Sequence, residues 1–134
     1  MLRYITPLLA LASPFAIADW TLVASTYNPT AYADLATRQR NGNYTTMHAL
    51  VDFKKVPFDG DNLPYLSLRM QVEYDCRNPR FRFIQLSSHD GHMGGGNTVY
   101  TAGEPGKWRP VTDSGIQQPL REAACNQPQE KSRK

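Results

Sequence analysis

Residues 65–76 read YLSLRMQVEYDC, and this stretch decides the fold because its side chains alternate between apolar and polar types. The apolar set occupies every even position and consists of Leu66, Leu68, Met70, Val72, Tyr74 and Cys76. Successive side chains of a strand point to opposite faces, so a period of two predicts a β-strand that is buried on one face. Because Cys76 ends this apolar face, we expect its sulfur partner to approach from the core side or from the edge of the core.

A second strand is predicted for residues 81–88, which follow a short polar break. If the two strands form a hairpin with a loop of even length, Cys76 lies opposite Phe81 and Tyr74 lies opposite Phe83. The apolar positions change phase after Phe83, so we expect a β-bulge there or cover on both faces.

The charged residues beside this break restrict the pairing further. The even-length loop places Asp75 opposite Arg82 on the polar face, which is a favourable cross-strand pair. A loop of odd length would turn Arg80 and Arg82 into the core, where the desolvation of two charges is costly. The hairpin is therefore expected to have the even-length loop.

Six further segments have the pattern or the flanking turn residues of strands, at residues 20–24, 31–34, 38–40, 44–53, 97–101 and 108–111. Asn41-Gly42 is a strong hairpin signal between the third and the fourth of these. Residues 118–126 predict a short helix, since Leu120, Ala123 and Ala124 share one helical face.

The two cysteines, Cys76 and Cys125, are expected to form a disulfide. They are an even number in a chain that we expect to be exported, and neither lies in the tight spacing of a zinc or redox motif. A bridge between positions this far apart stabilises by about 4 kcal/mol in the chain-entropy model. The fold class expected from these features is α+β, mainly an antiparallel β-sheet of about six strands with a short C-terminal helix tied to it by the disulfide.

Residues 1–18 have the pattern of a signal peptide. Arg3 provides a positive charge, residues 4–18 carry no charge, and Ala16-Ile17-Ala18 matches an A-x-A cleavage site. A transmembrane anchor is the alternative, but the uncharged stretch is 15 residues long, whereas a span needs roughly 18 or more. We therefore expect cleavage before Asp19 and no transmembrane segment in the mature chain.

The remaining chain is expected to form one domain followed by a disordered polar tail at residues 126–134. Residues 19–125 contain 11 Lys or Arg and 11 Asp or Glu, so the pI of about 9.0 reflects the tail rather than the domain. A domain without excess positive charge is a poor match for nucleic acid, and we expect no nucleic-acid partner.

One run of residues resembles catalytic or metal-binding chemistry. His89, Asp90 and His92 could together hold a transition metal, which we keep as an alternative to a polar strand end. Ser88, His89 and Asp90 are the residue types of a hydrolytic triad, but neighbouring side chains on a strand point to opposite faces. We expect no catalytic residues, no metal and no cofactor.

Four tyrosines near predicted turns, Tyr27, Tyr44, Tyr65 and Tyr100, are candidate binding residues. Exposed tyrosine is frequent in protein-recognition surfaces. The alternative is that these rings cover the edges of a thin core.

Several motifs spread over most of the chain resemble the surface-adhesin protein E family, which consists of small envelope proteins of Gram-negative bacteria. They are Trp20, Tyr32-Ala33-Asp34, Thr37, Gly42-Asn43, Ser67, Glu73-Tyr74-Asp75-Cys76, the segment at residues 91–96, Trp108-Arg109-Pro110-Val111 and Cys125. The resemblance covers residues 19–125 and implies an antiparallel sheet with a disulfide-tied helix. It also implies a non-enzymatic envelope protein related to an adhesin that binds host matrix proteins.

The function expected from the sequence is therefore that of an exported envelope protein that binds a protein or cell-surface ligand. The residue directly after the expected cleavage site is Asp19 and not a cysteine, so we expect no lipid anchor and a periplasmic location, with the cell surface or secretion as alternatives. Two other hypotheses stay open: a periplasmic metal-binding protein or enzyme that uses His89, Asp90 and His92, and an accessory subunit of an envelope complex.

Overall fold

The structure is a computed structural model that describes residues 18–57 and 64–126. The expected targeting segment, apart from Ala18, and the tail after Asn126 lie outside the described residues. The elements in chain order are β1 (Thr21–Ser25), β2 (Thr30–Asn41), β3 (Tyr44–Asp52), β4 (Ser67–Asp75), β5 (Arg80–His89), the 3-10 turn η1 (His92–Gly94), β6 (Thr98–Ala102), β7 (Arg109–Pro110) and α1 (Gln117–Cys125).

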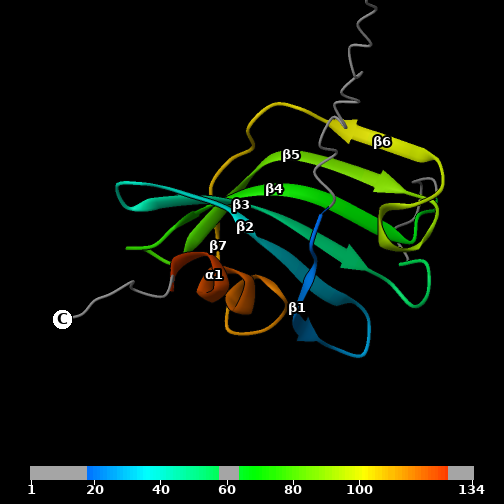
Figure 1. Cartoon of the computed structure of the whole chain (residues 1–134), viewed down its shortest axis with the longest axis horizontal. Helices are drawn as coiled ribbons and strands as arrows, with labels where there is room; N and C mark the ends of the chain where they lie inside the picture. Colours follow the sequence, from blue (N-terminus) through cyan, green and yellow to red (C-terminus); the bar gives the residue numbers. More distant parts are fainter. Residues whose placement is uncertain (1–17, 58–63, 127–134) are drawn as a thin grey trace, which may run out of the picture.

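The strands form one antiparallel sheet in the order β1-β2-β3-β4-β5-β6, with the two-residue β7 also paired to β5. Each strand of this order pairs with its neighbour in the chain, and α1 lies across one face of the sheet (Figure 1). The turn between β2 and β3 contains Gly42 at φ +66°, a left-handed conformation that favours glycine. The α+β class, the sheet of about six strands and the C-terminal helix are confirmed.

The strands expected at residues 31–34 and 38–40 are parts of the single strand β2, whose pairing with β3 is irregular between Asp34 and Gln39. Thr37 bridges this irregularity. Its hydroxyl donates to the carbonyl oxygen of Asp34 at 2.6 Å and accepts the backbone N–H of His48 at 2.9 Å. A side chain therefore satisfies backbone groups that the ladder leaves unpaired, and the strand continues.

The register expected for β4 and β5 is wrong by two residues. Cys76 was expected opposite Phe81, Tyr74 opposite Phe83 and Asp75 opposite Arg82, whereas Tyr74 lies opposite Phe81. The even shift leaves every side chain on its expected face: Phe81 is buried in the core.

The cause of the shift is the carboxylate of Asp75. It accepts the backbone N–H groups of Arg77 at 2.9 Å and Asn78 at 3.0 Å, so the turn closes directly after Asp75. Asp75 consequently lies opposite Arg80, whose Nε donates to it at 2.8 Å, and Arg82 pairs with Glu73 at 2.7 Å.

The bulge expected after Phe83 is confirmed. Gln71 lies opposite Gln85, whereas the next residue, Val72, lies opposite Phe83, so Ile84 is the extra residue of β5. The bulge explains why the apolar positions of β5 change phase along the strand.

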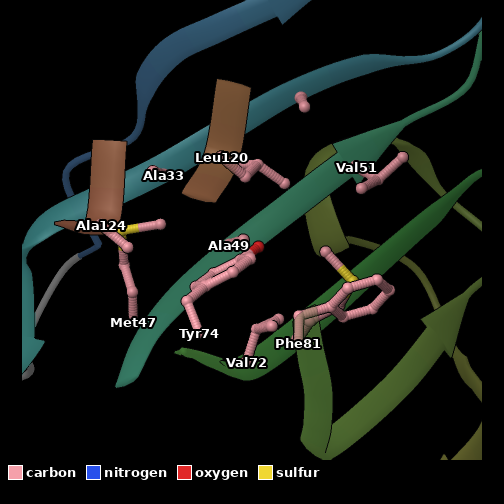
Figure 2. Close-up of a cluster of buried hydrophobic side chains, with 11 residues drawn as sticks. Ala33, Met47, Ala49, Val51, Val72, Tyr74, Phe81, Leu120 and Ala124 are labelled. Atoms are coloured by element: carbon pink, nitrogen blue, oxygen red, sulfur yellow. The ribbon is translucent and has the colours of Figure 1, made fainter. Parts of the chain in front are cut away.

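The core lies between α1 and the face of the sheet that carries the alternating apolar residues of β4. Figure 2 shows Leu120 and Ala124 of α1 beside side chains that the sheet contributes. Tyr74 is fully buried, and its hydroxyl donates to Gln117 Oε1 at 2.6 Å, so its polar atom is satisfied at the start of α1. Burial raises the pKa of Tyr74 far above its ordinary value, so this hydroxyl stays protonated.

The Cys76–Cys125 disulfide is confirmed and joins the residue after β4 to the last residue of α1, with 5.6 Å between the Cα atoms. Two arginines add hydrogen bonds between α1 and the sheet. Arg121 Nε donates to the carbonyl oxygen of Asp75 at 2.9 Å, and Arg38 Nη1 of β2 donates to that of Ala123 at 3.0 Å. The helix is therefore fixed to the sheet by a covalent bond, a packed face and these charged donors.

We predict that reducing the Cys76–Cys125 bond lowers the free energy of unfolding by about 4 kcal/mol. The bond closes a loop between positions 49 residues apart, and its reduction increases the conformational entropy of the unfolded chain. Urea unfolding with and without reductant measures the difference. A Cys76→Ser/Cys125→Ser variant is the control and should not respond to reductant. Equal unfolding midpoints for the oxidised and reduced wild-type protein would contradict the prediction.

A second prediction concerns Asp75, whose carboxylate is almost completely buried. Burial disfavours the charged form, but hydrogen bonds from Arg80 and from the backbone of Asn78 and Arg77 outweigh it and hold the pKa of Asp75 well below its usual range. We expect Asp75→Asn to lower the free energy of unfolding at pH 7 by about 3 kcal/mol.

The pH dependence follows from the sign of this shift. Since the folded-state pKa lies below the unfolded value of about 3.9, the contribution of Asp75 is complete above that pH and is lost as the pH falls below it. The difference in the free energy of unfolding between wild type and Asp75→Asn should therefore decrease as the pH is lowered, and urea unfolding at several pH values measures it. Glu73→Gln, at a more exposed ion pair of the same strand, is the control and should cost about 1 kcal/mol or less. A gap that stays constant from pH 7 to pH 2 would refute this role of Asp75.

Candidate binding site on the polar face of the sheet

The face of the sheet opposite α1 carries a row of polar side chains that crosses four strands. Asp34, His48, Gln71 and Gln85 are cross-strand partners in that order, from β2 to β5. Since directly paired residues point to the same face, the four side chains stand side by side. Trp20, just before β1, lines the same hollow as this row.

A second row runs parallel to the first and is built in the same way. Leu50, Arg69, Ser87 and Thr101 are cross-strand partners from β3 to β6. Leu50 is fully buried, whereas Arg69 and Thr101 are exposed. The second row thus contains one buried apolar side chain, Leu50, and polar side chains that solvent can reach.

A hollow of about 650 Å³ lies over these two rows. The described polar residues of its lining are Asp34, Thr37, His48, Arg69, Gln71, Gln85, Ser87 and Thr101, and Trp20 contributes a large aromatic ring. This volume is in the range of sites that bind small molecules in proteins, which is roughly 300–1,000 Å³.

The charges of the hollow balance. Arg69 contributes one positive charge and Asp34 one negative charge, and His48 is the only other titratable side chain that residues 18–57 and 64–126 contribute to the lining. Asp34 is only 8% exposed, and the backbone N–H of Asp19 donates to its Oδ2 at 3.4 Å. The hollow is therefore polar without a strong excess of either charge.

The three residues of the metal hypothesis each have different partners. His89 is buried between Ser87, whose Oγ lies 2.7 Å from its Nε2, and Thr98, whose Oγ1 lies 3.3 Å from its Nδ1. Asp90 accepts the backbone N–H of Asn97 at 2.7 Å. Among residues 18–57 and 64–126, no group of three or more His, Cys, Asp or Glu side chains is close enough to hold a metal ion.

His92 has a different partner from His89 and Asp90: its Nδ1 lies 3.2 Å from the carboxylate of Asp52 at the end of β3. The 3-10 turn that contains His92 is fixed to the sheet by this contact and by Ser67, whose Oγ accepts the backbone N–H of Gly94 at 2.8 Å. The two histidines of the motif therefore support different parts of the structure.

The environment of His89 favours its neutral form. Burial and the positive charge of Arg69 lower the pKa of His89, and the charge of Asp90 offsets part of this effect. The serine in contact with His89 is Ser87 rather than Ser88, and a threonine occupies the position at Nδ1 where a hydrolytic triad has an orienting carboxylate.

The four candidate tyrosines do not form one cluster and none of them lines the hollow. Tyr27, in the turn between β1 and β2, is 78% exposed, and Tyr100 on β6 is 59% exposed. Tyr65 packs edge-on against Phe53, with 5.7 Å between ring centroids. Tyr44 begins β3 at the other end of the strands and contacts Trp108, with 5.6 Å between ring centroids.

Trp108 forms a compact cluster with the two arginines of β5. The guanidinium groups of Arg80 and Arg82 lie 4.4 and 4.8 Å from the centre of its ring. Because each arginine also has a carboxylate partner, Asp75 or Glu73, the cluster is electrically balanced. Its cation–π contacts stabilise the sheet end locally.

Reasoning from the sequence missed the hollow. The signal that could have found it is the polar half of the alternating pattern, since Arg69 and Gln71 belong to the stretch that predicted β4. Their partners His48, Gln85 and Ser87 lie on other strands, and only the register of those strands brings them together.

Comparison with known proteins gives one family. A family model described as surface-adhesin protein E matches residues 20–126. Among solved structures, crystal form II of Haemophilus influenzae protein E is similar at a TM-score of 0.59 and 13% identity, over 93% of this chain and 97% of that chain. Another structure of Haemophilus influenzae protein E has a TM-score of 0.57 and 13% identity, over 80% of this chain and 83% of that chain. No curated protein sequence matches.

Proposed function

Because the chain belongs to the surface-adhesin protein E family, we propose that it is an exported, non-enzymatic envelope protein that binds a ligand in the hollow on the polar face of its sheet. The observation that carries this proposal is the division of the sheet into two faces. One face is covered by α1 and forms the core, whereas the other presents polar side chains around a hollow.

A binding role accounts better for the hollow than catalysis does. Ser87 lines the hollow and contacts His89. Within the described residues, the partner of His89 at Nδ1 is Thr98 and not a carboxylate that would stabilise the charged form of the histidine. The amides of Gln71 and Gln85 do not act as acids or bases, but they can both donate and accept hydrogen bonds. The protein therefore needs no cofactor for the function that we propose.

Two features support export: the expected cleavage site and the disulfide. The Ala16-Ile17-Ala18 site precedes the first strand, and the Cys76–Cys125 bond requires an oxidising compartment to form and persist. No helix in residues 18–57 and 64–126 is long and apolar enough to cross a membrane. From the expected cleavage site and the disulfide we propose that the mature protein is periplasmic.

The tyrosines add a second candidate contact surface at the end of the sheet where β1 meets β2. Tyr27 is exposed there, and Lys54 Nζ lies 5.6 Å from its ring. Tyr65 lies at the start of β4 at the same end, beside Phe53. An aromatic group of this kind suits a protein partner that extends beyond the hollow. Tyr100 is the remaining exposed ring, on the edge strand β6.

The location is tested by expressing the full chain in a Gram-negative host and fractionating the cells. We expect a processed protein that begins at Asp19, is released by osmotic shock and resists protease added to intact cells. An Ala18→Phe variant, with a large residue at the cleavage site, is the control and should stay unprocessed. Protease sensitivity on intact cells would contradict the periplasmic location, and an unprocessed wild-type protein would contradict export.

A further inference from the structure

We infer that the hollow on the polar face binds a saccharide through Trp20, Gln71 and Gln85. This inference rests on the proposed function and assigns a ligand class to its site. Gln71 and Gln85 lie directly opposite each other on β4 and β5, so their amides form an adjacent pair. Within the described residues, neither amide has a hydrogen-bond partner in the protein, so both pairs of donors and acceptors are available to a ligand.

The chemistry of the lining matches sugar hydroxyls. A hydroxyl both donates and accepts a hydrogen bond, and a primary amide offers both functions in one plane. Thr101 adds a hydroxyl and Arg69 adds planar N–H donors on the second row. Trp20 supplies an apolar ring beside these groups, which suits the C–H face of a sugar ring. The site thus has polar groups that fix orientation and one aromatic surface that excludes water.

A peptide fits this site less well. Extended peptides bind sheets by pairing with a free strand edge, where backbone N–H and C=O groups are unpaired. The hollow lies over the middle of the sheet, where the ladders between β3, β4 and β5 use those backbone groups. A phosphate or sulfate is also a poor match, because the lining contains the carboxylate of Asp34 as well as the guanidinium of Arg69.

A glycan array probed with the purified mature protein tests the inference. We expect binding to a restricted set of oligosaccharides, and titration of the best of them should change the fluorescence of the protein. Gln71→Ala and Gln85→Ala should each weaken binding by about tenfold or more, since each removes a bidentate polar contact. Gln39→Ala is the matched control, because Gln39 is an exposed amide of β2 outside the hollow, and it should not change affinity.

The possible outcomes test the class of ligand and the location of the binding site separately. If no saccharide binds, or if both glutamine variants bind saccharide as tightly as wild type, the saccharide inference is wrong. A peptide array is the parallel experiment: peptide binding that Gln71→Ala abolishes would overturn the saccharide and keep the hollow as the site. Binding of any ligand that is insensitive to both substitutions would overturn the site as well. Thermal unfolding of each variant checks that the fold is retained.

A second inference rests on a different observation, the buried carboxylate of Asp34. Burial of an ionised carboxylate without a partner is costly, yet Asp34 is only 8% exposed. Its carboxylate accepts one hydrogen bond, from the backbone nitrogen of Asp19 at 3.4 Å, and no other within the described part of the chain. That nitrogen belongs to the peptide bond that we expect signal peptidase to cleave.

We propose that cleavage of the Ala18–Asp19 bond creates an ion pair between the new α-ammonium group of Asp19 and the carboxylate of Asp34. In the hydrolysis, water supplies OH to the carbonyl carbon of Ala18 and H to the nitrogen of Asp19, which then takes up a proton at neutral pH. The charge appears on the atom that already lies beside Asp34. The pair fixes the segment that holds Trp20 at the hollow, and removal of Ala18, a lining residue, opens the hollow further.

Other charged groups near Asp34 do not replace this partner. His48 is its cross-strand neighbour on β3, Arg69 lines the second row of the hollow, and the side chain of Asp19 carries a negative charge of its own. The Arg69 guanidinium is exposed, and it has no hydrogen bond to Asp34 within the described residues. The α-ammonium group of Asp19 is therefore the cation placed to pair with the buried carboxylate.

The test compares residues 19–134 produced with a free N-terminal Asp19 and the same protein with one additional residue, Ala18. We expect the free form to unfold at a temperature higher by roughly 5 °C. Asp34→Asn should remove this difference, and Asp113→Asn, an exposed carboxylate, is the control that should leave it unchanged. The comparison of the two N-termini needs no Asp34 variant, so it remains decisive if Asp34→Asn fails to fold.

The pH dependence gives a second readout. A partner of opposite charge raises the pKa of the α-ammonium group above its ordinary value of about 8, so the stabilisation is complete below about pH 8 and is lost as the pH rises through the folded pKa. Equal unfolding temperatures of the two forms at pH 7, or a difference that persists in Asp34→Asn, would overturn the proposal.

Discussion

The disulfide between Cys76 and Cys125 is the constraint on which the arrangement of this small domain depends. It joins the end of β4, a central strand, to the last residue of the only α-helix that the structure describes. The alternating apolar residues of the strands make one face of the sheet apolar, and the bond holds α1 over that face. The opposite face carries polar side chains, and the hollow lies on that face. The bond and the alternation together separate the packed face of the sheet from the face that we assign to binding.

Asp75 reinforces the same end of the molecule through noncovalent contacts. Its carboxylate closes the turn between β4 and β5 and pairs with Arg80, and its carbonyl oxygen accepts a hydrogen bond from Arg121 of α1. The adjacent residue is Cys76, so the covalent and the ionic connections share one turn. Trp108 extends this rigid region by contacting Arg80 on the polar face. These contacts hold the register of β4 and β5 and connect it to α1 at one end of the sheet.

Much of this fold could be predicted because its signals are local. The alternation in residues 65–76 gives β4 and its buried face, and the even number of cysteines behind a targeting segment gives the disulfide. The register of β5 could not be predicted, because it depends on the hydrogen bonds of Asp75 to the backbone of its own turn. The hollow could not be predicted either, since its two rows require the register of four pairs of strands at once. The sequence indicates Asp34 only as part of a strand and of a family motif, whereas the structure shows that it is buried beside the nitrogen of Asp19.

We propose that this family member uses the polar face of its sheet, and not its helix or loop ends, to bind a ligand. Two-dimensional ¹⁵N–¹H NMR of the mature protein, titrated with the oligosaccharide that it binds best, locates the bound ligand. We expect the largest chemical-shift changes at Gln71, Gln85 and the indole N–H of Trp20, with α1 unaffected. Changes concentrated in α1, or at Tyr27 and Tyr65 with the hollow unaffected, would contradict it.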